Sequence, residues 1–233
     1  MPADETIILA GGRGTRLQSV VSDVPKPLAP VAGRPFLAWI LDRLAAGGMR
    51  RVIMATGYMA DAIEDAVGDQ WQSMAIAYSV ETEPLGTGGA VRKACRALHG
   101  DSAHVLNGDT FLRYDAAAFA ASVTRSGASL GVALAHVEDV SRYGAVERDG
   151  DRIVGFREKG GSGPGHVNAG CYFLTPKAIA ALPGDGAFSL EDTVLAPMTV
   201  QGRVHGFDRT SGFIDIGVPG DYLRAQSLFS AIR

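Results

Sequence analysis

Short apolar runs alternate with helical patterns through the first half of the chain, and this alternation constrains the fold more than any other feature. The runs suited to buried strands cover residues 7–10, 52–56, 76–80 and 104–106. Between them, the sequence pattern predicts helices over 36–44, 59–67 and 87–98, the first of which ends at Gly47. This βαβ order predicts a parallel sheet covered by helices, with ligands bound at the carboxyl ends of the strands.

The second half of the chain has a different pattern, typical of a mixed sheet. A hairpin is expected from residues 143–147 and 152–157, on either side of a turn at 149–151. Further strands are predicted at 128–137, 167–174, 204–207 and 213–216, and helices at 115–126, 176–182, 190–200 and from Pro219 to the C-terminus. The glycine-rich stretch 160–165 predicts a mobile loop.

Composition and charge argue against several classes of protein. The chain has 233 residues, of which 46% are hydrophobic, and this suits one large domain with a well-buried core. A net charge of −3 gives no electrostatic support for binding nucleic acid or an anionic membrane. Because no apolar run reaches about 18 residues and the N-terminus lacks an export signal, we expect a soluble, cytoplasmic protein. The sequence leaves open whether the protein forms a homo-oligomer.

The most informative motif is the glycine-rich string at residues 9–27. Its candidate phosphate-binding residues are Leu9, Ala10, Gly11, Gly12, Gly14, Thr15, Arg16 and Lys26. Glycines after a strand let backbone N–H groups approach a phosphate, and the two cations can neutralise a polyphosphate. The string lacks the Gly-Lys-Ser/Thr ending of a P-loop, and Leu17 stands where a dinucleotide-binding fingerprint has its last glycine. The alternative is a tight turn with a solvated arginine.

The string resembles the signature of the sugar-1-phosphate nucleotidyltransferases, also called nucleoside-diphosphate-sugar pyrophosphorylases. Its continuation SVVSDVPKPLAPVAGRPFL is most similar to the branch that makes GDP-D-glycero-D-manno-heptose. Matching motifs extend from residue 7 to 222. The resemblance implies an α/β fold, Rossmann-like, with a mixed, mainly parallel sheet, helices on both faces and no C-terminal β-helix. It also implies one domain, 1–233, with a nucleotide-binding half (about 1–115) and a sugar-binding half (about 116–233).

A second motif, ETEPLGTGG at residues 81–89, matches the family segment that contacts the nucleobase, which implies roles for Glu81, Pro84, Gly86 and Thr87. Thymidylyl and uridylyl relatives have Gln where this chain has Glu81. A carboxylate can accept from guanine N1–H and the 2-amino group, whereas a uracil carbonyl facing it would cost about 1–3 kcal/mol. Glu81, or failing it Glu83, therefore favours GTP, unless both are solvated acids. Thr87 also predicts an N-cap and a potential anion site, with simple packing as the alternative.

Two further motifs end in aspartates. Residues 105–109 read VLNGD, and residues 213–222 resemble the late family motif, with Phe213 where the family often has Trp. The resemblance implies that Asp109 and Asp215 are Mg²⁺ ligands, since Mg²⁺ takes one or two carboxylates plus phosphates and water. Gly108 is expected to contact the nucleotide. For a lone strand-end Asp, a turn-forming role is the alternative.

The resemblance also places a sugar-phosphate site in the second half. Glu158 and Asn168 would bind sugar hydroxyls, Lys159 would bind the 1-phosphate, and Gly144 would let the sugar lie against the backbone. Without the resemblance, the alternative is that these residues form a solvated charged face and a bend in a strand.

Together these motifs predict an enzyme that converts GTP and a sugar 1-phosphate into a GDP-sugar and pyrophosphate. The expected sugar is D-glycero-α-D-manno-heptose 1-phosphate, in a pathway to cell-surface polysaccharide. The catalytic residues would be Arg16 on the pyrophosphate, Lys26 on the α-phosphate and Asp109 on the metal. The alternatives are a mannose- or glucose-1-phosphate nucleotidyltransferase using GTP or another nucleotide, and a regulatory pseudoenzyme. A glycosyltransferase is disfavoured because Asn107 stands where an Asp-x-Asp motif needs its first acid.

Overall fold

The computed structural model describes residues 3–17, 20–21 and 23–231. Gln18, Ser19 and Ser22 of the glycine-rich string therefore lie outside the described residues, as do the two residues at each end of the chain. No helix in these ranges is long and apolar enough to cross a membrane.

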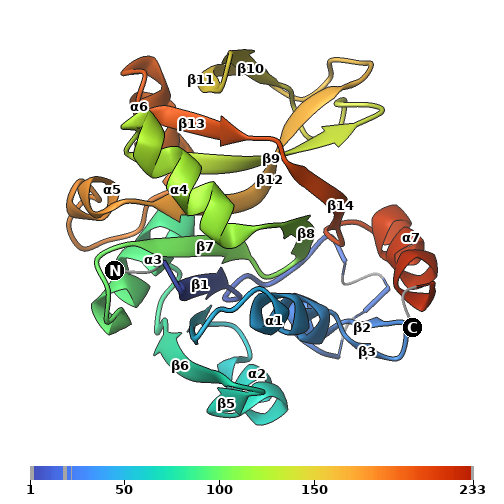
Figure 1. Cartoon of the computed structure of the whole chain (residues 1–233). Helices are drawn as coiled ribbons and strands as arrows, with labels where there is room; N and C mark the ends of the chain where they lie inside the picture. Colours follow the sequence, from blue (N-terminus) through green and yellow to red (C-terminus); the bar gives the residue numbers. More distant parts are fainter. Residues whose placement is uncertain (1–2, 18–19, 22, 232–233) are drawn as a thin grey trace.

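One large sheet carries the fold, with its strands in the order β10-β11-β13-β9-β12-β7-β1-β4-β6-β5 (Figure 1). The strand β1 (Glu5–Leu9) lies between β7 (Ala103–Asn107) and β4 (Arg51–Thr56), and β4 pairs with β6 (Met74–Val80). All of these neighbours are parallel. The βαβ order predicted from the apolar runs is therefore confirmed.

Strands from the second half of the chain extend the same sheet. β12 (Gly165–Leu174) pairs antiparallel with both β7 and β9 (Leu130–Val137), and β13 (Val204–Phe207) runs parallel to β9. The predicted hairpin forms from β10 (Val146–Asp149) and β11 (Arg152–Phe156), and β5 (Gln70–Trp71) lies at the other edge. Only β5, β11 and β12, among the described strands of this sheet, run against the common direction, so the predicted mixed, mainly parallel sheet is confirmed.

Helices cover both faces of the sheet because successive strand residues point to opposite sides. Ile8 belongs to the apolar core on one face and Ile7 to the core on the other, and both side chains are fully buried. The first core is closed by α1 (Phe36–Ala46), α2 (Ala60–Val67), α4 (Ala116–Ser126) and α7 (Pro219–Ser230). The second is closed by α3 (Gly86–Ala94), α5 (Pro176–Ala180) and α6 (Ala196–Val200). Figure 1 shows α1 and α4 lying across the near face.

Several element boundaries differ from the sequence prediction. The predicted helix 87–98 ends at Ala94 and continues as a 3₁₀ turn (Cys95–Ala97). The predicted helix 190–200 begins as a π turn (Glu191–Leu195), and Pro197, which has no N–H to donate, lies in the first turn of α6. The strands β2 (Pro30–Val31), β3 (Arg34–Pro35) and β8 (Thr110–Tyr114) were not predicted. β8 pairs with β14 (Thr210–Asp215) outside the large sheet, which brings residues 109 and 215 together.

Candidate active site

A pocket of about 430 Å³ opens at the carboxyl ends of the central parallel strands. This is the position that the strand order predicts for a ligand. The pocket is lined by Leu9, Ala10, Gly11, Gly12, Gly14, Thr15, Arg16, Lys26, Pro27, Ala55, Glu81, Pro84, Gly86, Thr87, Ala90, Asn107, Asp109 and Gly217. The set includes every residue that the sequence assigns to the nucleotide, except Gly108.

The glycine-rich loop is fixed against the ends of its neighbours. Ala10 N donates to Ala55 O at 2.8 Å, and Tyr58 N donates to Gly11 O at 3.3 Å. Gly14 has a φ of +59°, and a Cβ at this position would lie 2.9 Å from Lys26 Cβ. A side chain at residue 14 would therefore be strained and would displace the Lys26 stem. The loop and the lysine form one packed unit facing the pocket.

Lys26 points into the acidic end of the pocket. It begins a 3₁₀ turn (Lys26–Leu28) and lies between Pro25 and Pro27, whose fixed φ angles restrict the backbone on either side. Its Nζ forms an ion pair with Asp109 Oδ2, and only 11% of the lysine side chain is exposed. The other oxygen, Asp109 Oδ1, accepts from Thr110 Oγ1 at 3.2 Å. Arg16, by contrast, is exposed at the mouth of the loop.

Asp109 and Asp215 lie side by side although they are far apart in the sequence. Asp215 pairs with Thr110 across β14 and β8, and Ile216 N donates to Asp109 O at 3.0 Å. Asp215 Oδ1 accepts from Gly217 N at 2.6 Å. Burial raises the pKa of Asp215, as does the neighbouring Asp109 charge, while Lys26 acts in the opposite direction. Two neighbouring carboxylates, one of them paired with the Lys26 ammonium, form a site whose chemistry suits a divalent ion.

The donor set also limits which ion would fit. Among the residues that the structure describes, no three His, Cys, Asp or Glu side chains gather in a way that could hold a metal. An ion on Asp109 and Asp215 would therefore need phosphate oxygens and water to complete its shell, as Mg²⁺ does.

The base side of the pocket differs in part from the prediction. Glu81 lines the pocket, and its Oε2 accepts from Leu85 N at 3.1 Å, whereas Glu83 is exposed and lies outside the lining. Thr87 is not the N-cap, because α3 begins at Gly86. The amides of Gly88 and Gly89 both donate to Phe188 O, at 2.9 and 3.3 Å. Two amides in the first turn of α3 are thus engaged by packing against residue 188, while the anion site at Thr87 stays a prediction.

Gly108 has a structural role instead of a place in the lining. Its N–H donates to Leu9 O at 2.8 Å, and a Cβ would lie 2.8 Å from the same oxygen. The glycine therefore allows the ends of β7 and β1 to approach each other closely.

The site therefore combines a glycine-rich loop with a carboxylate pair at the strand ends. Residues 5–231 match the sequence model of the nucleotidyl transferase family. The chain belongs to this family. It is 39% identical to the D-glycero-alpha-D-manno-heptose 1-phosphate guanylyltransferase of Aneurinibacillus thermoaerophilus, over 95% of this chain and 96% of that one. It is 34% identical to the mannose-1-phosphate guanylyltransferase of Mycobacterium tuberculosis, but the match spans 64% of that protein. The crystal structure of HddC from Yersinia pseudotuberculosis complexed with GMP-PN has a TM-score of 0.86 at 38% identity, with 97% of this chain and 99% of that one covered.

The predicted resemblance to nucleotidyltransferases and the predicted fold are thus both confirmed. The four residues assigned to the sugar phosphate lie apart from the lining of this nucleotidyl transferase pocket, as far as the described residues show. Glu158 and Lys159 follow β11 and are exposed. Gly144 is buried with a φ of +80°, and a Cβ there would lie 2.4 Å from Arg157 O. The 160–165 stretch, expected to be a mobile loop, bonds to residues 140 and 141 through Gly163 O and Gly160 N.

Asn168 is connected to the pocket by a chain of hydrogen bonds. It lies in a bulge of β12, where its Oδ1 accepts from Gly170 N and its Nδ2 donates to Tyr172 OH, both at 3.0 Å. Tyr172 OH donates to Glu191 Oε1 at 3.1 Å, and Thr87 Oγ1 donates to Glu191 Oε2 at 2.7 Å. Thr87 lines the pocket. Sequence reasoning missed Tyr172 and Glu191, because neither has a local signal that separates it from an ordinary strand or helix residue.

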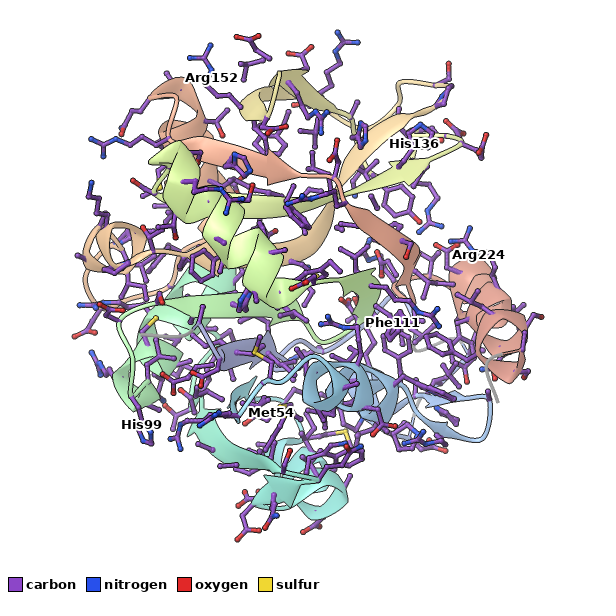
Figure 2. All side chains as sticks on the ribbon, in the orientation of Figure 1. Met54, His99, Phe111, His136, Arg152 and Arg224 are labelled. Atoms are coloured by element: carbon purple, nitrogen blue, oxygen red, sulfur yellow. The ribbon has the colours of Figure 1, made fainter. Side chains whose placement is uncertain are left out.

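A buried carboxylate holds the segment that leads into Gly144. Asp221, 4% exposed in the first turn of α7, forms an ion pair with Arg142 Nη1 and accepts from Tyr143 OH at 3.3 Å. Arg224 Nη1 lies 3.4 Å from Asp221 Oδ1, and Figure 2 shows Arg224 on the outer side of α7. Asn107 and Gly217, which line the pocket, were also missed although both belong to recognised motifs.

Proposed function

We propose that this chain transfers a guanylyl group from GTP to D-glycero-α-D-manno-heptose 1-phosphate, giving GDP-heptose and pyrophosphate. The observation that carries the proposal is the 39% identity to a heptose 1-phosphate guanylyltransferase over nearly the whole of both chains. The mannose-1-phosphate guanylyltransferase is less similar and is matched over only 64% of its length. Mannose 1-phosphate is therefore the second candidate substrate.

In this reaction, some residues of the pocket would bind phosphate and others would stabilise developing charge. An oxygen of the sugar phosphate attacks the α-phosphorus of GTP, the bond from that phosphorus to the β-phosphate oxygen breaks, and pyrophosphate leaves with its electron pair. The attacking oxygen is already anionic, so no side chain needs to remove a proton. The amides of the loop at 11–14 and Arg16 would bind the departing pyrophosphate, and Lys26 would offset the charge that develops around the α-phosphate.

Asp109 and Asp215 would hold Mg²⁺. When bound, this ion would supply positive charge that neutralises the phosphates. The adjacent carboxylates and the Lys26 ammonium that lies against Asp109 support this assignment, because a cation already balances charge at that position.

Glu81 is our candidate for reading guanine. Its Oε2 already accepts from Leu85 N, which fixes the carboxylate at the rim, and each carboxylate oxygen has a second lone pair for a base donor. The exposed position of Glu83 argues against the alternative that it reads the base. On the sugar side, we keep Gly144, Glu158, Lys159 and Asn168 as the proposed contacts. Because GTP is a cytoplasmic nucleotide, we place the reaction in the cytoplasm. Following the family resemblance, we place its product in cell-surface polysaccharide synthesis.

The test is a pyrophosphate-release assay of four nucleoside triphosphates against the 1-phosphates of heptose, mannose and glucose, with Mg²⁺ present. We expect the highest kcat/KM with GTP and the heptose phosphate. A higher value with mannose 1-phosphate would favour the second candidate. No pyrophosphate release with any pair would support a regulatory pseudoenzyme, although Arg16, Lys26, Asp109 and Asp215 are all present.

A further inference from the structure

The ion pair between Lys26 and Asp109 bears on the order in which ligands bind, and this inference rests on the proposed function. Its ammonium group is bound to Asp109 Oδ2, one of the two carboxylates that would hold the metal. The side chains of Lys26 and Asp109 are 11% and 28% exposed, so this is not a solvated surface pair. Asp109 Oδ1 accepts from Thr110 Oγ1, whereas Oδ2 is the oxygen that the Lys26 ammonium contacts.

Glycines lie at both ends of the Lys26 side chain and leave room for it. At the stem, a Cβ on Gly14 would lie 2.9 Å from Lys26 Cβ. At the tip, a Cβ on Gly217 would lie 3.1 Å from Lys26 Nζ and 2.8 Å from Asp215 Oδ1. One point in space is therefore in contact with both the ammonium and the second carboxylate. The lysine lies in a narrow slot between the phosphate loop and the carboxylate pair.

We propose that Lys26 occupies the metal position in the nucleotide-free protein, and that nucleotide phosphate releases it. Two cations on one carboxylate oxygen repel each other, so a divalent ion must displace the ammonium before it can bind Asp109 Oδ2. The phosphate loop packs on the Lys26 stem, so a phosphate bound there offers the ammonium another anionic partner within reach. Nucleotide and metal then bind with positive coupling, and each raises the affinity for the other by the same factor.

The experiment measures Mn²⁺ binding to the full chain by the electron paramagnetic resonance signal of free Mn²⁺, without nucleotide and with a non-hydrolysable GTP analogue. The variants are Lys26→Met, which keeps most of the stem, and Lys26→Ala. Arg16→Ala is the matched control, because it removes a pocket cation that is not paired with Asp109. We expect both Lys26 variants to bind Mn²⁺ about tenfold or more tightly than the wild type without nucleotide, and Arg16→Ala to match the wild type. Adding the GTP analogue should then raise the Mn²⁺ affinity of the wild type by a larger factor than that of the Lys26 variants.

Equal Mn²⁺ affinity of the wild type and both Lys26 variants without nucleotide would overturn the proposal. The proposal would also fail if Arg16→Ala raised the Mn²⁺ affinity as much as the Lys26 variants do. Adding Asp109→Asn to Lys26→Met should abolish the increase in Mn²⁺ affinity. That result would assign the increase to the site at Asp109. The comparison needs no sugar and no turnover. A wrong substrate assignment would thus appear in the pyrophosphate assay, while the Mn²⁺ comparison would still decide the role of Lys26.

Discussion

His104 makes the fold sensitive to acid in a way that can be calculated. Its imidazole lies on β7, is fully buried, and packs against the rings of Phe173 and Phe119, with centroid distances of 5.0 and 5.9 Å. Burial lowers the pKa of His104 to about 3, assisted by the Arg43 guanidinium, while the Ala3 backbone acts in the opposite direction. The imidazole is therefore neutral in the folded protein at every pH at which the protein is normally handled.

The sign of the effect follows from comparing the folded and unfolded chains. The pKa in the unfolded chain is about 6.5, so between pH 6.5 and 3 the unfolded state binds the proton and the folded state does not. Stability is fully present above pH 6.5 and is lost as the pH falls. At pH 5 the loss from this one residue amounts to about 2 kcal/mol, a sizeable part of a typical unfolding free energy of about 5–15 kcal/mol.

The groups around His104 do not obscure this effect. Burial raises the pKa values of Tyr114 and Cys171, the latter to about 12, so both stay neutral between pH 5 and 7. The Arg43 guanidinium carbon lies 4.7 Å from the centroid of the Tyr114 ring. His166 and His205 also have lowered pKa values, so the wild type should lose further stability that a His104 variant does not recover.

The assay is urea unfolding of the wild type and His104→Leu at pH 7 and pH 5, followed by circular dichroism. We expect the variant to lose about 2 kcal/mol less than the wild type over this interval. His99→Leu is the matched control, since His99 is exposed (Figure 2) and its replacement should leave the pH dependence unchanged. Equal losses in the wild type and His104→Leu would refute the reasoning.

Three predictions concern the site. Asp109→Asn should lower the Mg²⁺-dependent rate of pyrophosphate release by about 100-fold or more, because the metal loses a carboxylate, and the unfolding transition should show that the fold persists. Glu81→Gln should reduce the preference for GTP over UTP by about tenfold, measured as the ratio of kcat/KM values; an unchanged ratio would mean that other groups read the base. Asp221→Asn should raise KM for the sugar 1-phosphate by about tenfold and leave KM for GTP unchanged, because Arg142 and Tyr143 lose their charged partner. Arg224→Ala, which removes only the exposed partner of Asp221, should leave both constants near those of the wild type.

The nucleotide side of the site could be predicted from the sequence because its geometry follows from strand ends. Leu9, Ala55 and Asn107 end or nearly end parallel neighbours in register, so the loops that follow must meet at one edge. The role of Thr87 could not be predicted, because the groups that occupy the first turn of α3 come from residues 188–190, a segment remote in sequence. The structural role of Gly108 escaped the sequence for a related reason. A glycine before a strand-end Asp suggests contact with a ligand, but here it allows β1 to approach.

The sugar side depends on two carboxylates whose hydrogen-bond and ion-pair partners no local sequence pattern reveals. Asp221 and Glu191 both lie in helical segments where an acidic residue is ordinarily solvated. Removing a carboxylate from water costs free energy unless other donors replace the water. Each carboxylate therefore needs hydrogen-bond or ion-pair donors from other elements. Asp221 collects Arg142 and Tyr143 beside Gly144, and Glu191 collects Thr87 and Tyr172 beside Asn168. In both cases the partners include or adjoin a proposed sugar contact, and Thr87 lines the nucleotide pocket. These two acids, the buried Asp221 and the half-buried Glu191, therefore connect the two halves of the proposed site. Substrate specificity is expected to be most sensitive to their replacement.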